Sequence, residues 1–184
     1  MQVSSKEISV LINGVYDEKL TPDLLKSIHL KLPKSKIIFS TWENTKIPQS
    51  VADLCHKIVY NTDPGFEYND PNRKMPNNIL RILYAIEQGL KCCDGKYILR
   101  LRSDMVVFNT KFLNEFKKFK KRQPEIVLFK EKIIAHSFVT TDFIEQNGYK
   151  HYTPFHISDW YHFGLAEDIK ELYNLPKIDD IVEY

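Results

Sequence analysis

The stretch Lys96–Phe108, KYILRLRSDMVVF, is as apolar as a buried strand, yet it carries Arg100, Arg102 and Asp104 at every second position. Successive side chains of an extended strand point to opposite faces, so the three charged residues share one face and Leu99, Leu101 and Ser103 share the other. The pattern predicts either a buried structural ion pair or a strand whose charged end borders a ligand site.

Strand and helix patterns alternate on the N-terminal side of this stretch. Short apolar, β-branched runs predict strands, and apolar residues at helical spacing predict helices between them. The expected strands lie within residues 7–14 (EISVLING), 34–44 (KSKIIFSTWEN), 51–61 (VADLCHKIVYN, after a short helix) and 96–108. The expected helices are residues 21–32, with Thr21 as N-cap, and 76–90, closing at Gly89. Residues 61–76, rich in Asn, Asp and Pro, are expected to form a long loop.

This alternation predicts an α/β fold with a mostly parallel, Rossmann-like sheet flanked by helices on both faces. The chain has 184 residues, too few for an eight-fold barrel, and we expect residues 1–184 to form a single domain. Lys and Arg total 26 against 24 for Asp and Glu, a balance that does not indicate a nucleic-acid partner. Three cysteines without a metal-ligand spacing, and no signal or membrane-spanning pattern, predict a cytoplasmic protein.

The carboxyl ends of parallel strands are where such sheets bind ligands, at the point where the strand order reverses. The residues at the expected strand ends hydrogen-bond, stack or carry charge, as a nucleotide or sugar site requires. They are Asn13, Gly14, Thr41, Trp42, Glu43, Asp63, Arg102 and Asp104, with Arg100 one step back on the charged face. Neither a Gly-x-Gly-x-x-Gly motif after the first strand nor a P-loop motif occurs, which argues against those two nucleotide sites.

At an open cleft, the charged face of residues 96–108 would suit a diphosphate. Asp104 is a hard oxygen donor for Mn²⁺ or Mg²⁺, and Arg100 and Arg102 can hold the remaining phosphate oxygens. A diphosphate leaving group needs this neutralisation because charge develops on it as its bond breaks. The alternative is a structural arginine–carboxylate pair inside the sheet.

A second dense segment is residues 151–173, HYTPFHISDWYHFGLAEDIKELY. Asp159 beside Trp160 suits an acceptor sugar that stacks on the indole while the carboxylate, as catalytic base, takes the hydroxyl proton. His156 could contact the acceptor or phosphate, or be the base in place of Asp159. The structural alternative is an aromatic-rich loop packed beside the sheet, followed by a helix whose first turn contains Glu167 and Asp168.

Residues 112–125 combine an aromatic stripe with a cationic face. This pattern is typical of a solvated surface helix, and the alternative is a peripheral contact with an anionic membrane. The cations that would make this contact are Lys117, Lys118, Lys120, Lys121 and Arg122.

Six segments together resemble the WavE-type lipopolysaccharide synthesis proteins, which look like glycosyltransferases of the GT-A architecture. They are EISVLINGVY, KIIFSTWEN, NTDPG, NNILRILYAIEQGLK, KYILRLRSD and HISDWYHFGLAEDIKELY, in the family's order and approximate spacing. The resemblance implies a nucleotide-diphosphate sugar donor, a divalent cation and a glycan or lipid-linked acceptor in bacterial surface polysaccharide synthesis. It also implies that such chains continue beyond the last residue here, so this one is either truncated or a natural short form.

Carried over by position, Asp104 would stand for the last acid of the family's Asp-x-Asp signature, and Arg81 would belong to the donor site. The sequence departs from the pattern at Arg102, where the first acid of that signature would stand, and an arginine can neutralise a diphosphate without a metal ion. It departs again near Arg81, where Ile82, Ala85 and Ile86 replace polar residues of the family motif. A sugar nucleotidyltransferase and a non-catalytic nucleotide- or carbohydrate-binding module remain the alternative hypotheses.

Overall fold

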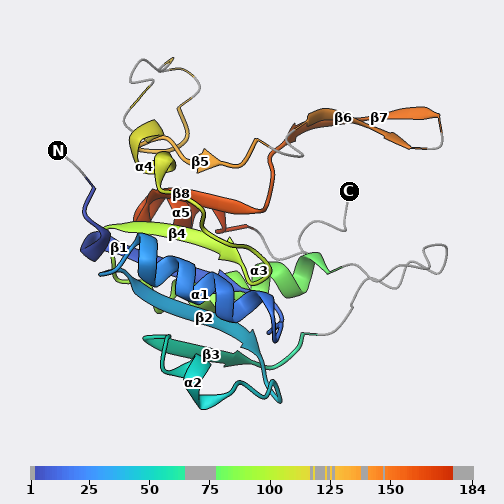
Figure 1. The fold of residues 1–184 in the computed structure, drawn as a ribbon. Helices are drawn as coiled ribbons and strands as arrows, with labels where there is room; N and C mark the ends of the chain where they lie inside the picture. Colours follow the sequence, from blue (N-terminus) through green and yellow to red (C-terminus); the bar gives the residue numbers. More distant parts are fainter. Residues whose placement is uncertain are drawn as a thin grey trace.

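A six-stranded sheet forms the centre of the computed structural model, which describes residues 3–64, 78–116, 118, 123, 125, 127–137, 141–146 and 148–175 (Figure 1). Its strands, in chain order, are β1 (Ile8–Asn13), β2 (Lys36–Trp42), β3 (Lys57–Asn61), β4 (Tyr97–Arg102), β5 (Ile134–Ala135) and β8 (Tyr161–Leu165). The helices are α1 (Leu20–Lys31), α2 (Gln49–Ala52), α3 (Ile79–Leu90), α4 (Lys111–Glu115) and α5 (Ala166–Leu172), with a 3₁₀ turn at Ser5–Glu7.

The strand order β3-β2-β1-β4-β8-β5 confirms the predicted α/β class with a mostly parallel sheet. Strands β1 to β4 run parallel, whereas β8 and β5 add an antiparallel edge that the sequence did not predict. The chain moves outward from β1 through β2 to β3 and then crosses back to place β4 on the other side of β1. The strand order therefore reverses between β1 and β4, whose carboxyl ends define the expected ligand crevice.

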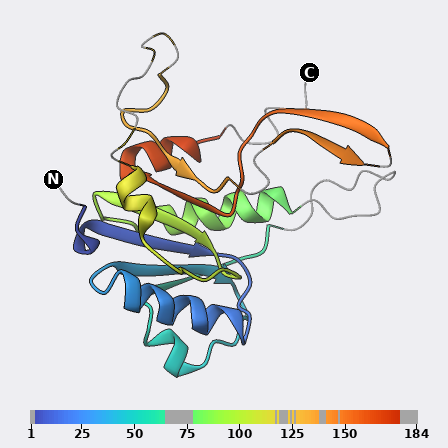
Figure 2. The same cartoon turned by 45° about the horizontal axis from the view of Figure 1, so that its top comes forward.

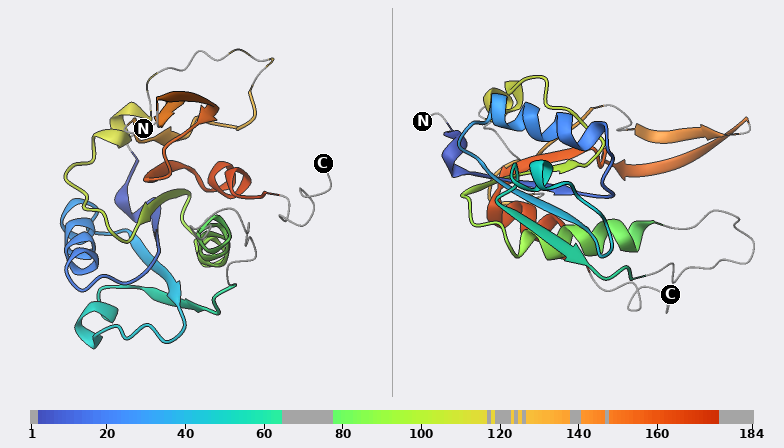
Figure 3. Two further views of the ribbon diagram at one scale, coloured as in Figure 1. Left: turned by 90° about the vertical axis from the view of Figure 1, so that its right-hand side faces the viewer. Right: turned by 60° about the horizontal axis from the view of Figure 1, so that its bottom comes forward.

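Helices cover the sheet on both faces (Figure 2, Figure 3). On one face, Leu24, Leu25 and Ile28 of α1 pack against alternate residues of β1, β2 and β4. On the other face, α3 and α5 contribute Ile86 and Ile169 to a second apolar cluster. Because β4 is buried between these layers, its two faces meet different environments, and the Arg100 face lies on the α3 and α5 side.

Two expected helix signals have other roles in the structure. Gly89 does not close α3 but lies within its last turn, where an added Cβ would come 2.3 Å from Leu11 Cδ1 of β1. This glycine therefore allows close packing of helix on strand. Thr21 lies inside α1 rather than capping it, and the carboxylate of Asp17 instead accepts hydrogen bonds from the backbone N–H groups of Lys19 (2.8 Å) and Leu20 (2.7 Å).

The C-terminal third is more regular than the expected aromatic loop. Strands β6 (Thr141–Gln146) and β7 (Tyr149–His156) form a separate antiparallel hairpin that projects from the main sheet (Figure 1). Residues 151–156 therefore belong to a strand, and the connection between β7 and β8 contains Asp159 and Trp160, as predicted. The sequence analysis placed residues 151–156 in a loop because β-branched and aromatic residues favour a strand only when a partner strand pairs with them, and the partner strand β6 was not recognised.

Glu167 and Asp168 have the structural role considered above, although through different contacts. The buried Asp168 carboxylate accepts hydrogen bonds from the backbone N–H groups of Lys130 and Glu131, each at 2.8 Å. Glu167 pairs with the ammonium of Lys130 at 2.8 Å. Both side chains therefore fasten the segment before β5 to α5.

Candidate active site at the reversal of strand order

The ends of β1 and β4 meet at the crevice, where Asn13 and Arg102 are register partners. Gly14 follows with φ +132°, a conformation that favours glycine, and an added Cβ would lie 2.6 Å from Ser103 Oγ. The Ser103 N–H also donates to the Asn13 carbonyl at 3.1 Å. Glycine at position 14 thus lets the two strand ends approach closely.

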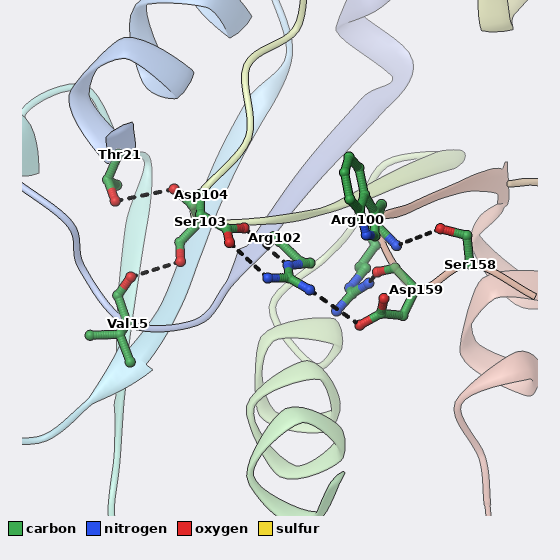
Figure 4. Close-up of polar contacts among 9 residues, drawn as sticks. Val15, Thr21, Arg100, Arg102, Ser103, Asp104, Ser158 and Asp159 are labelled. Atoms are coloured by element: carbon green, nitrogen blue, oxygen red, sulfur yellow. Dashed lines mark hydrogen bonds and ion pairs between the residues drawn. The ribbon is translucent and has the colours of Figure 1, made fainter. Parts of the chain in front are cut away.

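Ser103 fastens the loop after β1 to the end of β4 (Figure 4). Its hydroxyl donates to the Val15 carbonyl at 2.7 Å, and its own carbonyl accepts from the Thr21 hydroxyl at 3.2 Å. The Asp17 N–H donates in turn to the Thr21 oxygen at 3.0 Å. These bonds hold the backbone next to Asp104 in place, although Thr21 was expected only as a helix cap.

Arg102 lies between the two carboxylates that the sequence singled out (Figure 4). Its Nε and Nη2 donate to the two carboxylate oxygens of Asp104 at 3.0 and 2.7 Å, which is a bidentate ion pair. On the other side, its Nη1 is 3.8 Å from Asp159 Oδ2. The side chains of Arg102, Asp104 and Asp159 are 39%, 43% and 51% exposed, so a ligand can reach all three.

The ion pair fixes the charges of its members. The Arg102 guanidinium holds the pKa of Asp104 below its ordinary value, and the hydrogen bonds to Asp104 raise the pKa of Arg102. Both groups therefore stay ionised over the physiological range of pH.

Arg100 lies directly behind this surface and is 1% exposed. Its Nε donates to Asn13 Oδ1 at 2.7 Å, and its Nη1 donates to the backbone carbonyl of Asp159. The remaining nitrogen, Nη2, is buried and has no hydrogen-bond partner among the described residues. Arg100 therefore links the end of β1 to the Asp159 loop, and its guanidinium is not presented at the surface.

A buried aromatic group completes the surroundings of Arg100. Its Cζ lies 5.9 Å from the ring centroid of Tyr173, whose hydroxyl is 2.6 Å from Nδ1 of His162. Burial, together with the nearby Arg100 cation, lowers the pKa of His162 to about 4. This histidine, which lies in β8, is therefore neutral at physiological pH.

The buried His162 should make the stability of the protein depend on pH. Its folded pKa of about 4 lies below its ordinary value of 6.5, so the unfolded chain binds the proton first as the pH falls. We expect the free energy of unfolding to decrease between pH 6.5 and 4 through this residue, and to gain nothing from it above pH 7. Urea titrations at several pH values should show a weaker pH dependence for His162→Gln, and identical slopes would contradict this assignment.

The other residues predicted to bind the donor fall into an accessible set and a buried set. Asp63, after β3, and Arg81, on α3, form a bidentate ion pair at the same edge of the sheet, with Arg81 Nε donating to Asp63 Oδ1 at 2.7 Å. Trp42 is partly exposed and Glu43 exposed at the end of β2. Asn13 and Thr41 are buried, and Thr41 Oγ1 has no hydrogen-bond partner among the described residues.

A pocket of about 760 Å³ opens on the leucine face of β4, opposite Arg100. Its lining includes Leu101, Asp104, Phe112, His136, Trp160 and Tyr161. The His136 ring stands 5.3 Å from the Trp160 ring and 5.6 Å from that of Tyr161, centroid to centroid. The predicted acceptor residue Trp160 thus borders a cavity of ligand size, and Asp104 lies between this cavity and Arg102.

Sequence reasoning missed His136 and the loop after Asp104, because their proximity to Trp160 arises only when β5 pairs with β8. The backbone of His156 pairs with Thr141 at the end of the hairpin. The role predicted for the His156 side chain stays a prediction.

In the described part of the chain, no cluster of three or more histidine, cysteine, aspartate or glutamate residues could hold a metal ion. Among the same residues, no helix is long and apolar enough to cross a membrane.

Three solved structures illustrate the similarity to known folds. 4-Diphosphocytidyl-2C-methyl-D-erythritol synthase from Anaerococcus prevotii shares 16% identity and a TM-score of 0.50, over 98% of this chain and 80% of that one. A cytidylyltransferase from Leptospira borgpetersenii shares 13% identity and a TM-score of 0.49, over 93% and 65%. S. aureus TarS (residues 1–349) shares 16% identity and a TM-score of 0.39, over 59% of this chain and 30% of that one.

At these identities the synthase supports the fold alone. The chain spans less than a third of the TarS structure. Among proteins with curated descriptions, none matches the sequence. A family model described as WavE lipopolysaccharide synthesis, however, matches residues 11–182, which include the end of β1, all of β2 to β8 and every candidate site residue. The chain therefore belongs to the WavE lipopolysaccharide synthesis family.

Proposed function

We propose that this protein is a glycosyltransferase that moves a sugar from a nucleotide-diphosphate sugar to a growing bacterial lipopolysaccharide or another surface glycan. The observation that carries the proposal is the position of Arg102. This half-exposed cation stands at the reversal of strand order, between the carboxylates of Asp104 and Asp159 and next to the Trp160 pocket. Membership of the WavE family supports surface glycan synthesis as the setting.

In this proposal the donor lies along the carboxyl ends of β1, β2 and β4. The diphosphate accepts hydrogen bonds from Arg102, and the nucleoside lies toward Trp42 and Glu43. The Asp63–Arg81 pair borders the same edge of the sheet and supplies a second cation. Asn13, Thr41 and Arg100 act from below the surface, by shaping the strand ends rather than by contacting the donor.

The acceptor enters from the other side of Asp104, with its sugar ring stacked on Trp160 and, by the sequence prediction, in reach of His156. Asp159 accepts the proton of the acceptor hydroxyl while that oxygen attacks the anomeric carbon. The bond between the anomeric carbon and the diphosphate breaks, and the nucleoside diphosphate leaves with the electron pair. Its new negative charge develops beside the guanidinium of Arg102, which strengthens their interaction in the transition state.

Isothermal titration with UDP-, GDP-, CMP- and ADP-sugars tests this proposal. We expect one of the diphosphate classes, the UDP-, GDP- or ADP-sugars, to bind, and hydrolysis or transfer of its sugar to release the nucleoside diphosphate. A lack of binding by every donor would reject the transferase proposal for this chain. Binding without any turnover, even with lipopolysaccharide fragments as acceptor, would instead support the non-catalytic binding module.

A sugar nucleotidyltransferase remains the second candidate because 4-diphosphocytidyl-2C-methyl-D-erythritol synthase shares the fold at a TM-score of 0.50. The reaction products separate the two candidates. A nucleotidyltransferase would release pyrophosphate from a nucleoside triphosphate and a sugar phosphate, whereas a glycosyltransferase would release a nucleotide from a nucleotide sugar. The loop after β1 contains Gly14 as its only glycine, which fits the glycosyltransferase better than the nucleotidyltransferase.

The cytoplasmic location and the peripheral membrane contact also stay proposals. Of the five cations expected to contact lipid, the structure describes only Lys118, and Lys117, Lys120, Lys121 and Arg122 lie outside the described residues. The ammonium of Lys118 pairs with Glu115 at 2.7 Å. That pair is exposed, so it would exchange readily for a lipid phosphate.

A further inference from the structure

The family resemblance implies a divalent cation at Asp104, but the described residues do not fit one. Both carboxylate oxygens of Asp104 accept hydrogen bonds from Arg102, so a cation would have to displace a bidentate ion pair. Asp159, the other carboxylate beside Arg102, faces the same guanidinium. In the described ranges no histidine, cysteine or further carboxylate joins them as a third ligand, and Arg102, a cation, already occupies the space between the two carboxylates that a metal ion would have to share with the donor phosphates and water.

We propose that Arg102 replaces the divalent cation as the counter-charge for the donor diphosphate, and that Asp104 is a positioning residue that orients Arg102 instead of a metal ligand. This inference rests on the proposed glycosyltransferase function. It assigns a metal-independent donor site to a chain whose family resemblance implies a metal-assisted one.

The geometry of the guanidinium supports this role. Two of its nitrogens, Nε and Nη2, are engaged by Asp104, which fixes the plane of the group. The third, Nη1, makes no hydrogen bond within the described part of the chain, since Asp159 at 3.8 Å is beyond hydrogen-bond distance. The N–H groups of Nη1 are therefore available to a phosphate oxygen. A diphosphate bound there would lie beside Asp159, the proposed base.

The alternation along β4 explains why Arg102 can take this position. A side chain at position 102 points to the same face as Arg100, whose buried cation adds positive potential behind the site and, after Arg102 itself, lowers the pKa of Asp104. Two carboxylates at positions 102 and 104 would need an added cation to bind a diphosphate at all. With arginine at position 102, the charge needed by the diphosphate is part of the chain.

Binding of the nucleoside diphosphate of the preferred donor, measured by calorimetry in EDTA and again in excess Mn²⁺, tests the inference. We expect the same affinity in both conditions, and no stoichiometric Mn²⁺ binding to the protein alone by electron paramagnetic resonance. Binding that requires Mn²⁺ would overturn this inference while leaving the glycosyltransferase proposal intact. No binding of the nucleoside diphosphate in either condition would also overturn this inference, whereas the donor titration described above decides the glycosyltransferase proposal separately.

Variants of the ion pair separate a positioning role from metal ligation. Arg102→Gln should weaken nucleoside diphosphate binding about 10- to 100-fold, the scale of one or two charge-assisted hydrogen bonds, with or without Mn²⁺. Arg102→Lys should recover part of this loss because it keeps the charge without the planar fork. Asp104→Asn should have a smaller effect that is the same in EDTA and in Mn²⁺. A loss confined to the Mn²⁺ titration would make Asp104 a metal ligand.

Arg102→Asp provides the converse test, since it restores an acid at position 102 beside Asp104 and removes the cation that lies next to Asp159. We expect this variant to lose binding in EDTA and to gain binding that depends on Mn²⁺, with a bound Mn²⁺ signal. If Arg102→Asp still binds the nucleoside diphosphate in EDTA with wild-type affinity, Arg102 is not the counter-charge.

Discussion

Asp159→Asn is expected to lower the rate of sugar transfer about 10²- to 10⁴-fold, the usual contribution of a general base. Asparagine has nearly the same shape and keeps the backbone carbonyl that Arg100 binds, so the loop and the donor site should remain in place. The amide cannot accept the acceptor proton, however. The loss should therefore fall on kcat, with little change in donor affinity. Single-turnover assays with the donor identified by calorimetry would measure it.

The control for this change is Asp94→Asn, at the opposite edge of the sheet. Asp94 is an exposed carboxylate paired with Lys36 before β4, so the same chemical change is made away from the crevice. We expect full transfer activity for this variant. If Asp159→Asn is as active as Asp94→Asn, Asp159 orients the loop at most and another residue, such as His156, is the base.

The parallel part of the fold could be predicted from the sequence because its signals are local. The strands β1, β2 and β4 are apolar runs bounded by polar residues, and α1 and α3 carry apolar residues at helical spacing. The alternation of charge in β4 was also informative, because a strand places residues 100 and 102 on one face whatever lies around it. The carboxyl edge of the sheet then follows from parallel pairing.

The parts that could not be predicted depend on contacts between segments distant in the sequence. Nothing near Arg100 indicates that the Asp159 loop will supply a carbonyl to it, because that contact exists only once β8 pairs with β4. The same pairing brings Asp159 to Arg102 and joins the two sequence motifs into one site. The different burial of Arg100 and Arg102 has a similar cause, since Tyr173 at the end of α5 covers the first and leaves the second at the surface.

Arg100→Ala is expected to reduce the free energy of unfolding by about 3–5 kcal/mol, the scale for truncating a large buried side chain and leaving its partners unsatisfied. The variant would lose the packing of the arginine stem at a position that is 1% exposed. It would also leave Asn13 Oδ1 and the Asp159 carbonyl without their donor. Urea unfolding of wild type and variant at pH 7 would measure the difference.

Arg100→Met separates packing from hydrogen bonding at this position. Methionine fills much of the space of the arginine stem and removes the cost of burying a charge, so its stability should lie well above that of Arg100→Ala. Neither variant can hold the Asp159 carbonyl, however, and both should transfer sugar more slowly than wild type. Wild-type kcat in Arg100→Met would show that the Asp159 loop is positioned without this arginine. Wild-type stability in Arg100→Ala would show that the link from β1 through β4 to that loop contributes little to the fold. If Arg100→Met recovers stability but not kcat, as expected, then a single buried arginine both stabilises the sheet and holds the base beside Arg102.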